Sequence, residues 1–339
     1  MNPDRQLADH QKLALQFETA IGQVVLGQQR AIRLLAVAVF ARGHVLLEGG
    51  VGVGKTTLLR AVARGIGGQY ERIEGTIDLM PNDLIYYTSL DAKGKPAVSP
   101  GPLLKHGGEL STFFFNEINR ARPQVHSLLL RVMAERSASA FNREFAFPHL
   151  QVFADRNRVE KEETFELPAA ARDRFMLEIG VEAPQDPAVL EQLAFEPRFY
   201  DPDSLILSVP PALLPCQELN RIADLIQRGI HASDTLRAYV LNLWRATHRP
   251  QDFGVVLDEV EPAGLIDAGA SPRGMAYLIR AARVHAWLQG RDSVIPEDVQ
   301  AVFAPAIAHR IFLKPVYEYR RGELVPQLVE RILHSVAAP

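Results

Sequence analysis

Cysteine is scarce in this sequence, because Cys216 is the only one among 339 residues. A single thiol excludes an internal disulfide framework and a cluster of thiolate metal ligands, since both need more than one cysteine. Long apolar runs are missing too: the longest near the start, Leu34–Ala41, is far shorter than the roughly 18 residues of a membrane-spanning helix. The first residues, Met1–Arg5, are polar and lack the basic-then-apolar pattern of a secretory signal. We therefore expect a cytoplasmic protein without membrane insertion.

An excess of charge of one sign is also lacking. The chain has 37 Lys and Arg against 40 Asp and Glu, a formal net charge of −3. Proteins that coat nucleic acid through bulk charge need a basic excess, so this balance argues against that class. The ten histidines show no H-E-x-x-H spacing, and no serine lies in a G-x-S-x-G pattern. Zinc-protease and serine-hydrolase functions therefore have no support.

The first half of the chain alternates short apolar runs with helical patterns, as a parallel sheet with crossover helices does. At roughly 150 residues per domain, the length suggests about two domains. Five runs are predicted as strands: His44–Glu48, Tyr70–Glu74, Thr112–Asn116, Leu150–Ala154 and Phe175–Ile179. A further alternation on either side of Asn142-Arg143 predicts a hairpin. We expect a layered α/β domain over residues 1–183.

The composition changes after Pro184. Segment 184–215 is rich in proline, which is typical of a connector. Residues 216–339 show helical patterns, with a serine cap expected before two of the helices. The expected helices are Ser233–His248, Ser271–Gly290, Pro296–His309 and Pro326–Val336. The second domain is therefore predicted to be small and all-helical.

A glycine-rich segment follows the first expected strand. Gly49–Thr56 fits the pattern G-x-x-x-x-G-K-[ST] that cradles phosphate groups. Its glycines let successive N–H groups point at phosphate oxygens, and the next helix adds its N-terminus. Lys55 can reach the β- and γ-phosphates, and the Thr56 hydroxyl can ligate Mg²⁺. The predicted nucleotide-binding residues here are Gly50, Val51, Gly52, Val53, Gly54, Lys55, Thr56 and Thr57.

A second polar site is expected at the end of a neighbouring strand. An enzyme with such a loop needs one carboxylate for the Mg²⁺ shell and another to activate water. The usual Asp-Glu pair is here Asn116-Glu117, after the apolar run Phe113–Phe115. Asn116 can hold a metal-bound water but brings no negative charge, which predicts weaker Mg²⁺ affinity. Glu117 is the residue expected to polarise the attacking water.

A family resemblance extends over nearly the whole chain. It rests on five strings, found in this order: Val24–Gln28, His44–Gly49, Asn116–Ala121, Asp173–Phe175 and Gly269–Arg273. Together they resemble the MoxR-type AAA+ ATPases. Two positions depart from the usual family pattern. Asn116 replaces the usual aspartate, and the stretch Asp155–Arg158 is more basic than the common Thr-Gln-Asn-Pro. The resemblance therefore points to a divergent subgroup.

The resemblance implies a P-loop αβα ATPase core with a parallel sheet, here of five strands, followed by a helical lid. It implies ATP and Mg²⁺ bound between the two, and assembly into a homo-oligomeric ring, usually a hexamer. Val25, Gly27 and Gln28 lie in the stretch that usually flanks the adenine. Asn157 matches the polar sensor residue that helps to orient water near the γ-phosphate.

Arginines complete the implied site. Arg174 matches the arginine finger offered to the neighbouring subunit's nucleotide, and Arg172 is a rival for that role. Arg273, in the first turn of its helix, matches the lid arginine that contacts phosphate in the same subunit. Guanidinium groups remain charged and fork onto phosphate oxygens, so a finger from a neighbour would couple hydrolysis to assembly.

The implied function is ATP-driven remodelling of a client protein. Family members commonly act as chaperone-like factors that mature metalloenzymes or complexes, often with a partner that carries a von Willebrand factor A domain. Segment 75–111 matches a region of inserted elements near the ring's upper surface. Within it, Asp78–Pro81 either contact a substrate or form a structural loop. No residue in the sequence identifies the client.

Three other functions stay open at this point. An ATP-gated assembly scaffold with little or no hydrolysis is favoured by the uncharged Asn116. A nucleic-acid motor is disfavoured by the acidic balance and by the lack of an appended helix-turn-helix or basic tail. A small-molecule kinase is disfavoured because a helical lid with Gly-Ala-Ser-Pro-Arg has no place in it.

Overall fold

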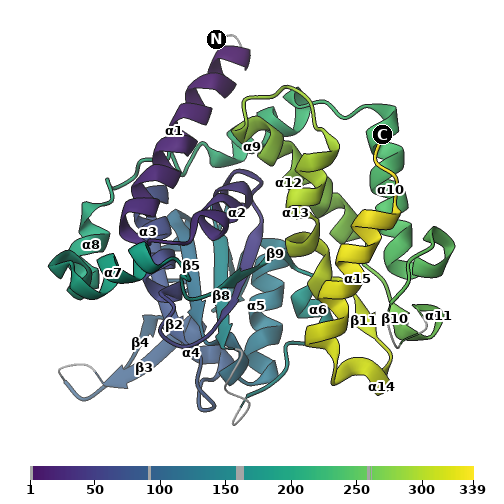
Figure 1. Cartoon of the computed structure of the whole chain (residues 1–339). Helices are drawn as coiled ribbons and strands as arrows, with labels where there is room; N and C mark the ends of the chain where they lie inside the picture. Colours follow the sequence, from purple (N-terminus) through teal and green to yellow (C-terminus); the bar gives the residue numbers. More distant parts are fainter. Residues whose placement is uncertain (1–2, 91–92, 158–163, 258–259, 261) are drawn as a thin grey trace. The chain divides into compact units, whose positions relative to one another are not determined.

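The computed structural model describes residues 3–90, 93–157, 164–257, 260 and 262–339 (Figure 1). The chain forms two compact units. The sheet unit comprises Leu13–Arg174 and Ile179–Asn220. The helical unit comprises Met1–Lys12, Phe175–Glu178 and Arg221–Pro339.

A five-stranded parallel sheet forms the core of the sheet unit, in the order β2-β5-β8-β1-β9 (Figure 1). The strands are β1 (His44–Gly49), β2 (Gln69–Glu74), β5 (Leu110–Asn116), β8 (Gln151–Asn157) and β9 (Phe175–Val181). Each of them contains or overlaps one of the five runs predicted from the sequence. Phe113, Phe114 and Phe115 are fully buried in β5, which lies between β2 and β8. The predicted α/β fold class is confirmed.

Helices lie before and between the parallel strands, which need crossover connections. In the sheet unit and at its start they are α1 (Pro3–Val24), α2 (Gln29–Phe40), α3 (Lys55–Ile66), α4 (Pro81–Ile85), η2 (Ile118–Arg120), α5 (Pro123–Glu135) and α6 (Ala169–Arg172). Segment 75–111 contains α4, the hairpin β3 (Tyr86–Leu90) and β4 (Pro96–Pro100), and η1 (Gly107–Glu109). The second hairpin, β6 (Ser137–Ala140) with β7 (Arg143–Ala146), is the one predicted from the sequence. Its turn is Phe141-Asn142, where both residues have positive φ, rather than Asn142-Arg143.

The proline-rich segment is more regular than a simple connector. It contains α7 (Pro187–Phe195), η3 (Pro197–Tyr200) and α8 (Pro202–Ser208), each with proline at the start, where proline fits a helix best. The Ala212 and Leu214 amides donate to the Arg64 and Gly65 carbonyls at the end of α3, at 2.9 Å each. The segment is thus fastened to the sheet unit. The division into 1–183, 184–215 and 216–339 stays a prediction.

The described part of the helical unit contains one short pair of strands, β10 (Ile266–Ala268) and β11 (Phe312–Leu313), as well as helices. Its elements are α9 (Leu219–Gly229), α10 (Asp234–His248), η4 (Pro250–Phe253), α11 (Pro262–Leu265), β10, α12 (Pro272–Leu288), α13 (Pro296–Ile307), η5 (Ala308–Arg310), β11, α14 (Pro315–Glu318) and α15 (Arg321–Ser335). Ser233 and Ser271 cap α10 and α12 through their hydroxyls, as predicted. Helix α9 was not predicted, and the predicted start of the last helix at Pro326 was wrong. Buried Leu324, Val325, Leu328 and Val329 continue the apolar period through that proline, so α15 begins five residues earlier, at Arg321.

Arg310 is a fully buried charged residue of the helical unit. Its guanidinium donates to the carbonyls of Phe175 at 2.5 Å, Met176 at 3.3 Å and Ala306, and lies 5.2 Å from the centre of the Tyr277 ring. The side chain therefore satisfies several buried acceptors at once.

Replacing Arg310 with methionine should lower the free energy of unfolding by about 3 kcal/mol, because buried carbonyls lose their donor. Urea denaturation followed by circular dichroism measures this change. The matched control is Arg228→Met on α9, whose side chain is 80% exposed and pairs with Asp224. Equal unfolding midpoints for the two variants would contradict a stabilising role for Arg310.

Candidate functional site

The phosphate loop lies between β1 and α3 of the sheet unit. Gly52 and Gly54 have φ of +76° and +87°, a left-handed conformation that favours glycine. At Gly49, a Cβ atom would lie 2.2 Å from the Val181 carbonyl oxygen, so only glycine fits beside β9. Val51, at the tip of the bend, is 69% exposed. The segment thus has the strand–loop–helix context that phosphate binding requires.

Lys55 begins α3 and is buried. Its Nζ donates to the Gly49 and Gly50 carbonyls at 3.1 and 2.8 Å and to Asn157 Oδ1 at 2.7 Å. The Asp155 carboxylate lies 3.9 Å from the same nitrogen. The structure therefore brings together Lys55 and Asn157, which are far apart in the sequence.

The residues predicted to hold Mg²⁺ also meet. Thr56 Oγ1 lies 3.5 Å from Asn116 Oδ1, and the Asn116 amide nitrogen donates to Glu74 Oε1. Mg²⁺ takes oxygen ligands and keeps several waters, binding through one or two protein groups together with substrate phosphates. The described residues hold no group of three or more His, Cys, Asp or Glu side chains that could bind a metal unaided. Thr56 and Asn116 fit a metal shared with a nucleotide.

Glu117 follows β5 with φ of +51°, a rare backbone conformation for a residue other than glycine. Asn157 Nδ2 donates to its Oε1 at 3.1 Å, and Arg120 Nη1 donates to its Oε2 at 2.8 Å. The Glu117 amide donates to Asp155 Oδ1 at 2.6 Å. Both carboxylate oxygens are thereby held, and Asn157 joins Glu117 to Lys55. Positions that combine strain with such contacts cluster at functional sites.

Comparisons with known proteins agree with this geometry. Residues 44–177 match the ATPase family associated with various cellular activities (AAA), and residues 263–332 match the AAA lid domain. The chain is 59% identical to Protein MoxR of Methylorubrum extorquens over 99% of this chain and 98% of that one. It is 33% identical to Chaperone MoxR1 of Mycobacterium tuberculosis, over 94% of this chain and 80% of the relative.

The chain belongs to the MoxR-type AAA+ ATPases. A crystal structure of a Cytophaga hutchinsonii protein assigned as an ATPase superposes with a TM-score of 0.80 at 29% identity, over 98% of this chain and 99% of that one. The lid match and this likeness confirm the predicted AAA+ fold with a helical lid.

The site of this MoxR-type chain contains three residues that the sequence did not predict as site residues: Glu74, Arg120 and Asp155. Glu74 ends β2 and Asp155 lies in β8, beside Asn116 and Glu117 at the same edge of the sheet. Burial raises the pKa of Asp155 to about 6, against the opposing effects of the Glu117 amide and Lys55. For Asp155 a signal was available, since it follows the apolar run Leu150–Ala154, whereas Glu74 ends a polar strand. The signal at Asp155 was missed because the order of the strands in the sheet was not known.

The stretch predicted to flank adenine lies at the start of α2 in this ATPase. Val25 is buried, and Gly27 has φ of +72°. A Cβ at Gly27 would lie 2.8 Å from Pro184 Cβ. Gln28 Nε2 donates to the Glu182 carbonyl at 2.5 Å, so this stretch is tied to the segment after β9. Its contact with adenine stays a prediction.

The predicted arginines lie at three places. Arg172 ends α6, and Arg174 follows it and donates through Nη1 to the Ala170 carbonyl at 2.8 Å. Arg273 is an exposed residue in the first turn of α12, in the helical unit. The roles of these arginines, and those of the other predicted site residues, stay predictions.

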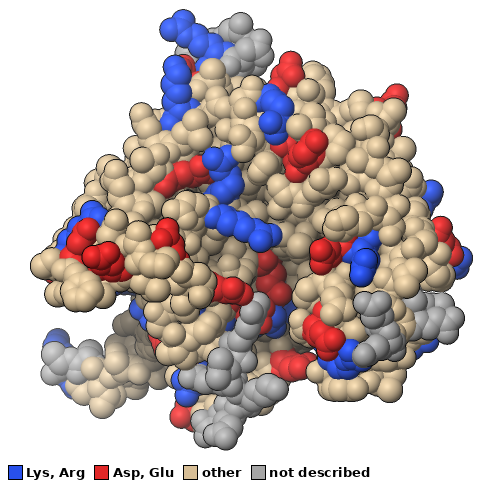
Figure 2. Space-filling model, viewed as in Figure 1, with Lys and Arg blue, Asp and Glu red and all other residues tan. Residues whose placement is uncertain are grey.

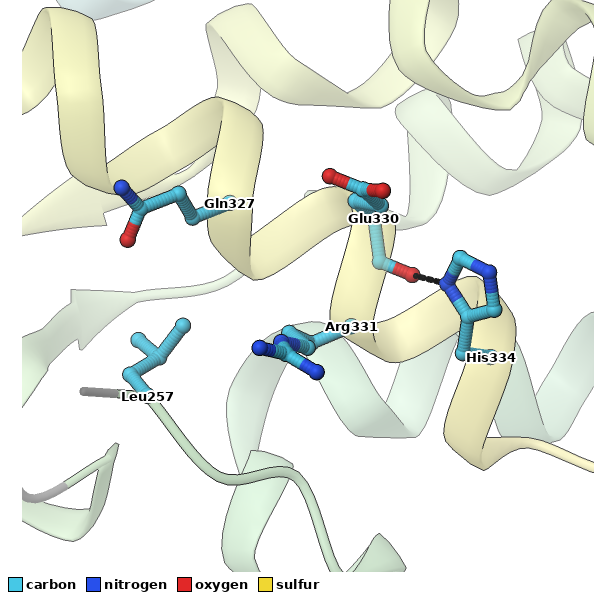
Figure 3. Close-up of a pocket in the computed structure, with 5 residues that line it drawn as sticks. All are labelled: Leu257, Gln327, Glu330, Arg331 and His334. Carbon is cyan, nitrogen blue, oxygen red and sulfur yellow. Dashed lines mark hydrogen bonds between the residues drawn. The ribbon is translucent and has the colours of Figure 1, made fainter.

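A pocket of the helical unit is separate from the predicted residues. It encloses about 480 Å³ among Leu257, Gln327, Glu330, Arg331 and His334 (Figure 3). His334 Nδ1 donates to the Glu330 carbonyl, 2.8 Å away, on the same helix. No residue of the phosphate loop lines this pocket, so the pocket is not part of the candidate nucleotide site.

The surface of this AAA+ protein carries mixed charge. On the face drawn in Figure 2, lysine and arginine lie interspersed with aspartate and glutamate among the described residues. In the same part of the chain, no helix has the length and apolar character needed to cross a membrane.

Proposed function

We propose that this MoxR-type protein binds ATP with Mg²⁺, hydrolyses it, and uses the cycle to remodel or mature a client protein. One observation supports this most strongly: Lys55, Asn157 and Glu117 form one hydrogen-bonded chain beside Thr56 and Asn116. These are the residue types that phosphoryl transfer to water requires, in one site. A relative carries the name Chaperone MoxR1, which supports the remodelling role.

Each residue of the proposed site has a defined task. The loop amides of Gly50–Gly54 and the Lys55 ammonium bind the phosphates and orient them. Mg²⁺, when bound, neutralises charge on the phosphate oxygens, with Thr56 as a ligand and Asn116 acting through a water. Glu117 accepts the proton of the attacking water, and the Asn157 amide holds that carboxylate in place.

Assembly and partners extend the proposal. We infer a homo-oligomeric ring, with six subunits as the expected number, in the cytoplasm. Segment 75–111 would face clients, and a protein with a von Willebrand factor A domain would assist. Val25, Gly27 and Gln28 would contact adenine, and Arg273 would contact phosphate from the lid. The interspersed charges on the face drawn in Figure 2, together with the formal net charge of −3, support a protein client over nucleic acid.

Phosphate release by the purified protein with Mg²⁺ and ATP tests the proposal. A clear rate above that of the Glu117→Gln variant is expected. A rate equal to that variant's, with ATP still bound, would favour the second candidate, an ATP-gated scaffold with little or no hydrolysis. The uncharged side chain of Asn116 favours this second candidate, because it brings no negative charge to the expected Mg²⁺ position.

Arg174→Ala should lower turnover by at least about tenfold while ATP affinity stays unchanged, because a finger stabilises charge only in the transition state. Arg172→Ala is the matched control from the same turn. If the finger acts between subunits, mixing Arg174→Ala with Lys55→Ala protein should restore part of the rate, since some interfaces then combine an intact lysine with an intact arginine. Full activity of Arg174→Ala alone would instead move the role to Arg172 or remove it.

A further inference from the structure

The amide of Asn116 has a defined orientation in the sheet unit. Its Oδ1 faces Thr56 Oγ1, at 3.5 Å, and its Nδ2 donates to Glu74 Oε1. An asparagine amide has one accepting end and one donating end, so its function depends on which end faces the metal position. Glu74 Oε1 accepts from the amide nitrogen, which keeps the amide oxygen on the Thr56 side.

The sheet itself aligns these two residues. Glu74 and Asn116 are register partners at the ends of β2 and β5. The next residue, Gly75, donates its amide to the Asn116 carbonyl at 2.7 Å. A Cβ at Gly75 would lie 2.1 Å from the Glu117 carbonyl oxygen, so a glycine is needed for this close approach. The pairing of Glu74 with Asn116 is thus built into the backbone.

Glu74 also carries the charge that Asn116 lacks. Its second oxygen, Oε2, accepts from Arg72 Nη2 at 2.8 Å, and the side chain is 48% exposed, which leaves the carboxylate hydrated. Asp155 is another nearby carboxylate, but its oxygens face the Glu117 amide and Lys55 rather than Asn116. A carboxylate that accepts from an amide nitrogen makes the oxygen of that amide a stronger acceptor, here for a metal-bound water.

We propose that Glu74 serves Mg²⁺ through Asn116, as a positioning residue that fixes the amide oxygen towards Thr56 and supplies negative charge from the neighbouring strand. The inference rests on the proposed ATP site. It changes one expectation drawn from the sequence, because the loss of charge at Asn116 is offset one strand away. The pair Glu74 and Asn116 does what one acidic residue at the end of β5 would do.

The test is the Mg²⁺ concentration that half-saturates binding of a fluorescent, slowly hydrolysed ATP analogue. Glu74→Gln should raise that concentration by about 10- to 100-fold, the usual cost of losing a partner of a metal ligand. The affinity of Glu74→Gln for the analogue in EDTA, where no Mg²⁺ is free, should equal that of the wild type. A general loss of structure would lower this affinity as well. The control is Glu71→Gln, the same change on the same strand, at a residue that pairs with Lys105 and His106.

Rescue gives the second readout. The swapped pair Glu74→Gln with Asn116→Asp restores one carboxylate and one amide, and should return the Mg²⁺ requirement to within about threefold of the wild type. An unchanged Mg²⁺ requirement in Glu74→Gln would overturn the inference while leaving the ATP site intact. So would a loss seen in Asp155→Asn but not in Glu74→Gln. If the wild type binds no analogue at all, the proposed function itself fails.

Discussion

Replacing Lys55 with alanine should lower ATP affinity by at least about 100-fold, because hydrogen bonds to charged groups contribute about 1.5–3 kcal/mol each and the ammonium can reach two phosphates. The side chain is buried at the start of α3 and already points at the loop carbonyls and Asn157. Its charge therefore acts in a partly desolvated site, where electrostatic interactions are strong. Titration calorimetry with ATP and Mg²⁺ measures the loss.

The matched control is Lys105→Ala. Lys105 has a side chain that is 57% exposed and pairs with Glu71, away from the phosphate loop, so its loss should leave ATP affinity within about threefold. Circular dichroism shows whether both variants fold. Tight ATP binding by a folded Lys55→Ala protein would show that the loop is not the phosphate site.

Strands and the phosphate loop could be predicted from the sequence because their signals are local. The five runs are short, four of them are largely apolar, and Gly49–Thr56 carries a spacing with few other uses. Helix caps were predictable for the same reason: Ser233 and Ser271 act within their own first turns. The start of α15 was predicted wrongly because Pro326 suggests a helix boundary. The buried apolar residues on both sides of Pro326 instead keep the helix continuous.

Contacts between strands could not be predicted, because they depend on the order of the sheet. Glu74 and Asn116 are register partners only because β2 lies next to β5, and Asp155 reaches Glu117 only because β8 lies on the other side. The pattern of residues indicated Asn116 as a weakened metal site. The sheet order places the Glu74 carboxylate within hydrogen-bond distance of Asn116, and the spacing of residues along the chain does not predict this contact.

Glu117→Gln should reduce phosphate release by about 100- to 1,000-fold, the usual contribution of a general base, while ATP affinity stays within about threefold. Glutamine keeps the size and the accepting oxygen that meets Asn157 Nδ2, while its amide nitrogen replaces the oxygen that accepts from Arg120, so the Arg120 contact is lost and the Asn157 contact is kept. It cannot take a proton from water, and the loss therefore falls on turnover. Single-turnover phosphate release and calorimetry separate the two effects.

Glu135→Gln is the control for this change, since Glu135 is a surface residue of α5 that pairs with Arg131. The contrast between rate and affinity decides between the two candidate functions. A wild-type rate far above that of Glu117→Gln shows that the hydrogen-bonded carboxylate works as a base despite the uncharged Asn116. Equal rates, with ATP bound tightly by both proteins, would mean that Glu117 is held by Arg120 and Asn157 for assembly alone, and that nucleotide occupancy rather than its turnover is the signal.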